Sequence, residues 1–287
     1  MSSQITTAFV EQYSNNVQML SQQKGSLLRD KVDSETVQGK NAFFEQIGSV
    51  TAQVRTTRHA PTPQLDTPHA RRRVSLADYE FADLIDDQDK VRTLIDPTSS
   101  YAQAAAFAMG RAMDDVIISA ATGTSFTGVS GGTSTALPGG QAITESGTDG
   151  LTIAKLRNAK RIMDLNSVDA SIPRYIVVSP RQIDDLLGTT SVTSADFNTV
   201  RALVTGEVNT FMGFQFIVSN RLSIASSKRL CFAYAQDGIK LALGKDVMSR
   251  IDERADVGYA TQIYYCMSIG ATRMEEEKVV SIQAHEA

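Results

Sequence analysis

Residues 96–123 read DPTSSYAQAAAFAMGRAMDDVIISAATG, and this stretch predicts a single long helix. Asp96 and Pro97 form a start signal, because aspartate accepts hydrogen bonds from free backbone amides and proline fits the first helical turn. Gly123 suits the end of a helix, since glycine readily adopts the left-handed conformation found there. A helix of about 26 residues is about 39 Å long, roughly twice the usual length, so it needs cover on several sides.

Charged residues near the middle of this helix argue against a membrane span. Arg111, Asp114 and Asp115 interrupt the apolar run, whereas a span needs about 20 predominantly apolar residues. We therefore predict a core helix on which these three residues mark the part that faces solvent or a neighbouring subunit. The first 16 residues lack the basic and apolar regions of a signal peptide, so we expect the protein to stay where it is made.

The composition is that of an ordinary globular protein. The 287 residues are 42% hydrophobic and 21% charged, which is enough to build two packed subdomains. A net charge of −4 shows no basic excess, and this argues against a protein dedicated to binding nucleic acid. Cys231 and Cys266 lie in strand-like runs without metal-binding spacing, so we predict buried free thiols and no disulfide.

The N-terminal part predicts an arm followed by a projecting hairpin. Residues 4–31 have the spacing of an amphipathic helix that ends near Gly25 and docks on another surface. Residues 41–57 and 71–85 read as two strands on either side of a proline-rich tip. A two-stranded ribbon buries too little surface to be stable alone, so this hairpin needs a neighbour.

Charges are sorted along the predicted hairpin. Arginines lie near its tip and acidic residues fill its base, and opposite charges at the two ends suit contact between copies of the chain. The candidate inter-subunit contacts are Arg55, Arg58, Arg71, Arg72, Arg73, Asp83, Asp86, Asp87 and Asp89. Two alternatives stay open: both ends are simply solvated, or the sequence HARRR at 69–73 binds nucleic acid.

The remainder of the chain predicts a mixed α+β region and returning strands. Residues 124–150 are rich in Gly, Ser and Thr and read as a loop. Further helices are expected at 151–166, 180–187 and 194–204, and strands at 174–179, 211–219, 229–235 and 239–243. The alternation at 259–269 and the apolar run at 278–284 predict strands that pack on the long helix.

Signals for catalysis and for bound groups are weak. The sequence GVSGG at 128–132 formally matches a nucleophile elbow around Ser130 with His285 downstream, but an elbow needs a strand before the serine and a helix after it. His285 lies near the chain end, where fraying is expected. His59 and His69 lack a third ligand at a suitable spacing, and no phosphate-binding loop occurs. We therefore expect no catalytic residues, no metal and no cofactor.

The order of these parts resembles the major capsid proteins of tailed bacteriophages, whose α+β shell fold is often named after phage HK ninety-seven. The resemblance is carried by four phrases: YAQAAAFAMGRAMDDVIISAATG, RYIVVSPRQIDDLL, FMGFQFIVSNRL and GYATQIYYCMSIGATRMEEEKVVSIQ. It implies an N-terminal arm at 1–36, an extended hairpin called the E-loop at 37–86, and a mixed α/β A-domain at 140–258. The peripheral P-domain would comprise 87–139 and 259–287, with its spine helix at about 97–122.

The resemblance also implies a function and partners. It implies a structural protein, not an enzyme, that assembles as pentamers and hexamers into an icosahedral shell around the double-stranded DNA genome of a tailed phage. Expected partners are copies of the chain, a portal, in some members a decoration protein, and a separate scaffolding protein, because the arm is too short to include a scaffolding segment. The DNA would be enclosed without sequence-specific binding and without a membrane, in a virion capsid assembled in the bacterial cytoplasm.

Two other functions stay open at this point. An encapsulin-like nanocompartment would use the same shell fold to enclose protein cargo instead of a genome. More remotely, a serine hydrolase would use Ser130 as its nucleophile.

Overall fold

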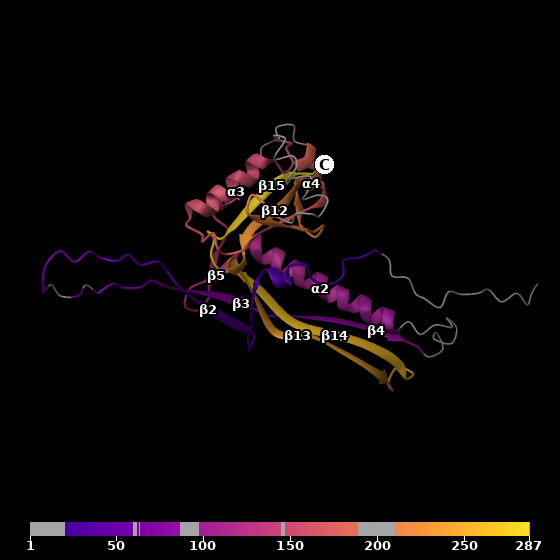
Figure 1. Cartoon of the computed structure of the whole chain (residues 1–287). Helices are drawn as coiled ribbons and strands as arrows, with labels where there is room; N and C mark the ends of the chain where they lie inside the picture. Colours follow the sequence, from indigo (N-terminus) through magenta and orange to yellow (C-terminus); the bar gives the residue numbers. More distant parts are fainter. Residues whose placement is uncertain are drawn as a thin grey trace, which may run out of the picture. The chain divides into compact units, whose positions relative to one another are not determined.

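The computed structural model describes residues 21–59, 62, 64–86, 98–144, 147–188 and 210–286 (Figure 1). The helices of this part of the chain are α2 (Thr98–Thr122), α3 (Ile153–Leu165) and α4 (Pro180–Gly188). The strands are β1 (Asp33–Thr36), β2 (Asn41–Ile47), β3 (His69–Ser75), β4 (Ala77–Ile85), β5 (Ser125–Thr127), β6 (Thr133–Thr135), β7 (Ala142–Ile143), β8 (Arg174–Val178), β9 (Thr210–Phe211), β10 (Phe214–Val218), β11 (Ile224–Ala225), β12 (Lys228–Ala235), β13 (Ile239–Arg254), β14 (Ala260–Arg273) and β15 (Val279–His285).

Contacts divide the chain into two compact units. The first comprises the described residues of Met1–Ser26, Asp78–Arg111 and Asp246–Met267. The second comprises Leu27–Ala77, Ala112–Lys245 and Ser268–Ala287, again where described. The elements α2, β13 and β14 contribute residues to both units, so this division cuts across long continuous elements.

A seven-stranded mixed sheet forms the main core of the second unit. Its strand order is β7-β15-β12-β8-β10-β9, with β11 paired to β12. All residues of β8 are buried, which explains why its apolar run Tyr175 to Val178 is continuous instead of alternating. Helix α3 packs against β15 and β7, with Leu156, Ala159 and Met163 on its buried face.

Several sequence predictions are confirmed. The long helix, the helices at 151–166 and 180–187 and the strand at 174–179 correspond to α2, α3, α4 and β8. Cys231 and Cys266 are buried free thiols. The predicted helix at 194–204 and most of the predicted arm helix lie outside the described residues, and residues 21–31 contain only a short 3-10 turn.

Gly123 is required at the end of α2 because there is no space for a side chain, and not because of its backbone conformation. It does not adopt the predicted left-handed conformation. Its amide donates to the carbonyl of Ser119 at 2.9 Å, and a Cβ atom at Gly123 would lie only 2.4 Å from that oxygen. The glycine is therefore needed because a side chain would collide with the last turn of the helix.

The predicted hairpin is shorter than its sequence pattern suggested. Strand β2 ends at Ile47, and residues 49–56, whose alternation suggested a longer strand, form none. Strand β3 pairs antiparallel with β2, with Ile47 opposite His69. The run at 71–85 breaks at Leu76, and its second half is β4, which pairs with β14 instead of with the hairpin.

The Gly- and Ser-rich segment predicted as a loop contains two short strands. β5 and β6 pair antiparallel and extend the hairpin into a four-stranded sheet of order β2-β3-β5-β6. Gly128 and Gly131 take positive φ values of 93° and 64° in the turn between them, which glycine tolerates without strain. Threonine is a good strand former, so the low-complexity composition concealed a real hairpin.

The C-terminal strand is firmly held, in contrast to the predicted fraying at His285. β15 pairs on one side with β12 and on the other with β7. The carboxylate of Glu286 accepts hydrogen bonds from Arg229 Nε at 2.8 Å, from Ser179 Oγ at 3.0 Å and from Gln182 Nε2 at 3.3 Å. These donors, Arg229 above all, lower the pKa of Glu286 from 4.5 to about 2.

Glu286→Gln is expected to lower the free energy of unfolding by roughly 1–3 kcal/mol at neutral pH, because hydrogen bonds to a charged group contribute about this much. A carboxylate with a depressed pKa stabilises the fold above its ordinary pKa of 4.5, and this stabilisation is lost as the pH falls towards about 2. Urea denaturation curves of the parent and the variant should therefore converge over this range. Glu277→Gln, at an exposed position before β15, is the control; a stability difference between parent and Glu286→Gln that persists unchanged at the acid end would contradict the prediction.

Candidate inter-subunit surface

The connection between β2 and β3, residues 48–68, exposes apolar side chains. Val50 is 54% exposed, Val54 87% and Leu65 44%, and Ile47, the last residue of β2, is 70% exposed. The connection is closed at its root, where the amide of Gly48 donates to the carbonyl of Pro68 at 2.8 Å. Figure 1 shows it extending well beyond the paired ends of β2 and β3. A projecting segment with exposed apolar side chains is typical of a surface that another chain covers.

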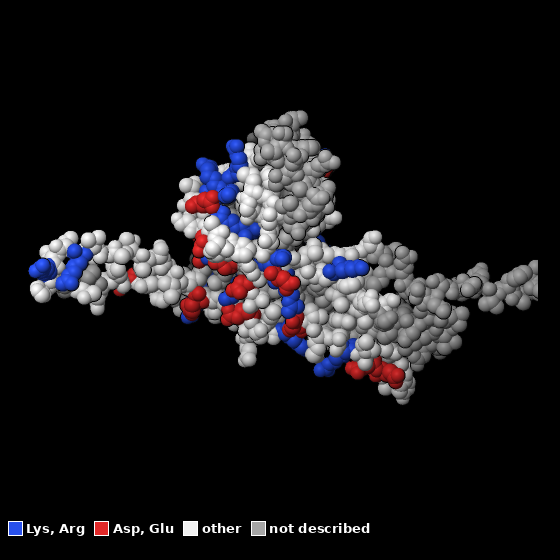
Figure 2. Space-filling view, in the orientation of Figure 1, with Lys and Arg blue, Asp and Glu red and all other residues white. Residues whose placement is uncertain are grey.

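Only two of the predicted tip arginines lie in this connection. Arg55 and Arg58 are exposed there, and Arg55 Nε donates to the carbonyl of Thr57 at 3.1 Å. Figure 2 shows Lys or Arg side chains at the far end of the hairpin. The other arginines, Arg71, Arg72 and Arg73, lie on β3 opposite residues of β2. The prediction that these three are near the tip is wrong, because pairing of the strands already begins at His69.

The arginines on β3 contact the chain itself. Arg71 Nε donates to Glu45 Oε1 at 2.7 Å, and its guanidinium lies 5.4 Å from the centre of the Phe43 ring. Arg73 lies 4.8 Å from the centre of the Phe126 ring on β5. These side chains therefore hold the sheet β2-β3-β5-β6 together.

Arg72 points to the opposite face of β3 and is only 6% exposed. Its guanidinium donates to Glu276 Oε2 at 2.5 Å and to Ser125 Oγ at 2.9 Å. The sequence predicts that Arg72 is one of the inter-subunit contacts. The structure instead places it in the interior, paired with a carboxylate 204 residues further along the chain.

Arg273 completes this buried cluster and is fully buried at the end of β14. It donates to the carbonyls of Ala121 and Gly123 at 3.0 and 2.8 Å, and to that of Thr135 at 3.2 Å. Glu276 lies 3.7 Å from it. Burial lowers the pKa of Arg273. Because the C-terminal carbonyls of a helix carry partial negative charge, they help to offset the second buried cation.

The acidic residues predicted at the base of the hairpin lie on β4 or beyond it. Asp83 is half-buried, and its own carboxylate accepts from the amide of Leu84 at 2.9 Å. Asp86 is exposed. Asp87 and Asp89 lie outside the described residues. Since β4 pairs with β14, Asp83 lies at the edge of another sheet and not, as predicted, at the base of the β2–β3 hairpin.

The arm contacts α2 through its backbone. Asp114 is fully buried, and its carboxylate accepts from the amides of Leu27 and Leu28 at 3.0–3.2 Å. The prediction that Asp114 faces solvent or a neighbour is therefore wrong. Its partners are backbone amides more than 80 residues away, which a helical pattern does not reveal.

A glycine on α2 allows this close approach. A Cβ atom at Gly110 would lie 2.5 Å from the carbonyl carbon of Gly25. The neighbouring Arg111 donates to Gln22 Oε1 at 2.9 Å and to the carbonyl of Gln23 at 3.2 Å. The arm segment therefore lies directly against the helix.

Other candidate sites have no support from the geometry. Ser130 is exposed between β5 and β6, so a strand follows it and not the helix of a nucleophile elbow. His59 and His69 are exposed. In the described part of the chain, no group of three or more His, Cys, Asp or Glu side chains is placed to hold a metal ion. None of the described helices is both long and apolar enough to cross a membrane.

Glu276→Gln is expected to lower the free energy of unfolding by roughly 3–5 kcal/mol, since it leaves buried guanidinium groups without their carboxylate. Glu277→Gln, one residue further at an exposed position, should change stability by less than about 0.5 kcal/mol. Thermal and urea unfolding measure both variants. Equal stability of the two variants would show that Glu276 does not hold the cluster.

Comparisons with known proteins agree with this geometry. A family model described as phage capsid protein matches residues 5–286, whereas no curated protein matches the sequence. The capsid protein of Ralstonia phage GP4 superposes with a TM-score of 0.76 at 10% identity, covering 97% of this chain and 96% of that one. The capsid of cyanophage P-SCSP1u superposes with a TM-score of 0.75 at 18% identity, covering 100% of this chain and 96% of that one. These matches confirm the predicted HK ninety-seven-like shell fold. The chain belongs to the phage capsid protein family.

Proposed function

We propose that this chain assembles as pentamers and hexamers into an icosahedral shell that encloses the double-stranded DNA genome of a tailed phage. Membership of the capsid family supports a structural, non-enzymatic role. The observation that carries the proposal is the connection at 48–68, which presents Val50 and Val54 to solvent in the single chain. Burying each such side chain against a neighbour would contribute about 1.5–3 kcal/mol.

The division into parts predicted from the sequence belongs to this proposal. The arm at 1–36 would dock beneath a neighbour, and the E-loop at 37–86 would lie over one. The P-domain, 87–139 with 259–287, would supply the spine, and the A-domain at 140–258 would meet its copies around a symmetry axis. Contacts of modest strength that repeat around closed rings give a stable shell and let misplaced subunits dissociate.

Charge completes the proposed contact between neighbours. Arg55 and Arg58 lie exposed at the far end of the hairpin, and Asp86 is exposed after β4. We place Asp83, Asp87 and Asp89 with Asp86 as the acidic partners on the next copy. Opposite charges across such an interface fix its register and speed the encounter of subunits.

The remaining partners follow from assembly. A separate scaffolding protein would set the shell size, a portal would occupy one vertex, and a decoration protein would bind outside in some members of the family. The DNA would be confined without sequence-specific contacts. Assembly would take place in the cytoplasm of the bacterial host, and the product would be the virion capsid.

Reversing the charge at the hairpin end tests the contact. Arg55→Glu with Arg58→Glu is expected to reduce the yield of shells several-fold while leaving thermal unfolding of the single chain unchanged, because both side chains are exposed. Electron microscopy counts shells formed with the candidate scaffolding protein. Adding Asp83→Lys and Asp86→Lys should restore part of the yield. The charges on the two surfaces are then exchanged, so the surfaces attract each other again.

The matched control reverses two exposed cations elsewhere, Lys40→Glu with Lys245→Glu. It has the same net charge as the hairpin variant and should assemble like the parent. Equal shell yield from the hairpin variant would refute the proposed pairing. A parent chain that stays monomeric with its scaffolding protein would refute the capsid function itself.

A further inference from the structure

Helix α3 presents a basic outer face. Arg157, Lys160 and Arg161 are exposed, whereas Leu156 and Ala159 on the other side of the helix are buried in the core. Residues three and four apart on a helix are neighbours on its surface, with Cβ atoms about 5–6 Å apart. The three cations therefore form one group, and Figure 2 shows Lys and Arg side chains gathered over this helix.

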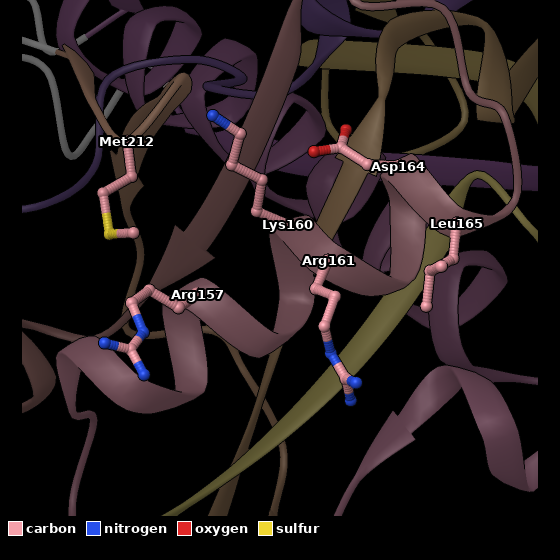
Figure 3. Close-up of a pocket in the computed structure, with 6 residues that line it drawn as sticks. All are labelled: Arg157, Lys160, Arg161, Asp164, Leu165 and Met212. Carbon is pink, nitrogen blue, oxygen red and sulfur yellow. The ribbon is translucent and has the colours of Figure 1, made fainter.

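The basic face borders an open depression of about 390 Å³. Its lining residues are Arg157, Lys160, Arg161, Asp164, Leu165 and Met212 (Figure 3). Met212 belongs to a tight turn between β9 and β10, in which Met212 and Gly213 have positive φ values of 54° and 86°. In Figure 3 the side chain of Lys160 extends towards this turn. One wall of the depression is thus a helix and the other a hairpin turn.

The positive charge of the depression is not neutralised within the chain. Its one carboxylate, on Asp164, is bound by Arg174 at 2.7 Å, and Arg174 is itself only 6% exposed. Arg161 donates to an amide oxygen, that of Asn158, at 2.9 Å. Among the described residues, Arg157 and Lys160 have no acidic partner.

We infer that this face of α3 binds the phosphate backbone of the enclosed DNA and therefore lines the interior of the shell; the inference rests on the proposed function. Two arginines can each bind a phosphate group through paired hydrogen bonds, and the lysine adds a point charge. The depression is open and offers cations instead of a pocket shaped for a base, which suits backbone contacts without sequence readout. Three contacts per subunit are weak singly but repeat in every copy of the shell.

DNA is favoured over an acidic protein by the regular arrangement of the cations. All three project from α3, with Lys160 and Arg161 three and four residues after Arg157, and a nucleic acid backbone offers charges at regular intervals. The neighbouring apolar side chains, Leu165 and Met212, are too few to bury the apolar face of a partner protein.

The test measures binding of a short random-sequence DNA duplex to the purified full chain by fluorescence anisotropy. Arg157→Gln with Lys160→Gln and Arg161→Gln is expected to weaken binding roughly 100-fold at about 0.1 M salt, and to reduce the slope of log affinity against log salt by about 3. The control variant, Lys40→Gln with Lys245→Gln and Arg250→Gln, removes the same charge from exposed positions elsewhere. It should bind like the parent.

A second variant separates charge from folding. Arg157→Lys with Arg161→Lys keeps the three cations and should keep the salt dependence. Unchanged DNA affinity of the Gln variant, or no binding by the parent, would overturn the inference. It would also be overturned if polyglutamate of similar charge displaced the DNA at equal concentration, because the face would then prefer an acidic protein.

Electron microscopy of the same samples keeps the two proposals apart. Parent shells combined with unchanged DNA affinity of the Gln variant would overturn this inference alone. Absence of parent shells would overturn the proposed capsid function, while the anisotropy measurement would still report on the charge of α3.

Discussion

The hydrogen bonds from the buried guanidinium of Arg273 to the C-terminal end of α2 are the interaction on which the rest of the structure depends. Arg273 joins the last carbonyls of the helix to β14 and β6, and through Glu276 it reaches Arg72 on β3. Burying two cations with one carboxylate is costly, and the cost is offset only while all hydrogen-bond partners are in place. The cluster therefore fixes the position of β3 relative to the C-terminal end of the helix.

The same helix organises the arm by a different means. Asp114 uses a buried carboxylate to bind backbone amides at Leu27 and Leu28, so the arm is positioned through its main chain. Gly110 leaves room for that main chain at Gly25. A core helix normally positions its neighbours by burying apolar side chains. Here the charged side chain of Asp114 and the absence of a side chain at Gly110 position the arm. Both position a segment that comes from far away in the sequence.

The spacing of residues along the sequence predicted the helices and strands whose burial follows from that spacing alone. The spacing of apolar residues identified α2, α3 and β8 because their periodicity reports directly which face is buried. It failed where a partner lies far along the chain. Arg72 reads as a surface charge until Glu276 is placed beside it, and Asp114 reads as solvent-facing until the arm arrives. A signal was present in Arg273, a cation in phase with the alternating apolar residues Ile263, Met267 and Ile269, but only the fold identifies its partners.

The position of β15 within the seven-stranded sheet has a consequence for synthesis. β7, β8 and β12 emerge from the ribosome before it, yet β15 lies between β7 and β12 and pairs with one edge of each. Until residues 279–285 arrive, two strand edges remain open, and open edges invite pairing with other chains. The carbonyls of Ala121 and Gly123 at the end of α2 likewise lack the hydrogen bonds from Arg273 until that residue has been synthesised. The seven-stranded sheet therefore cannot close until residues 279–285 have been synthesised.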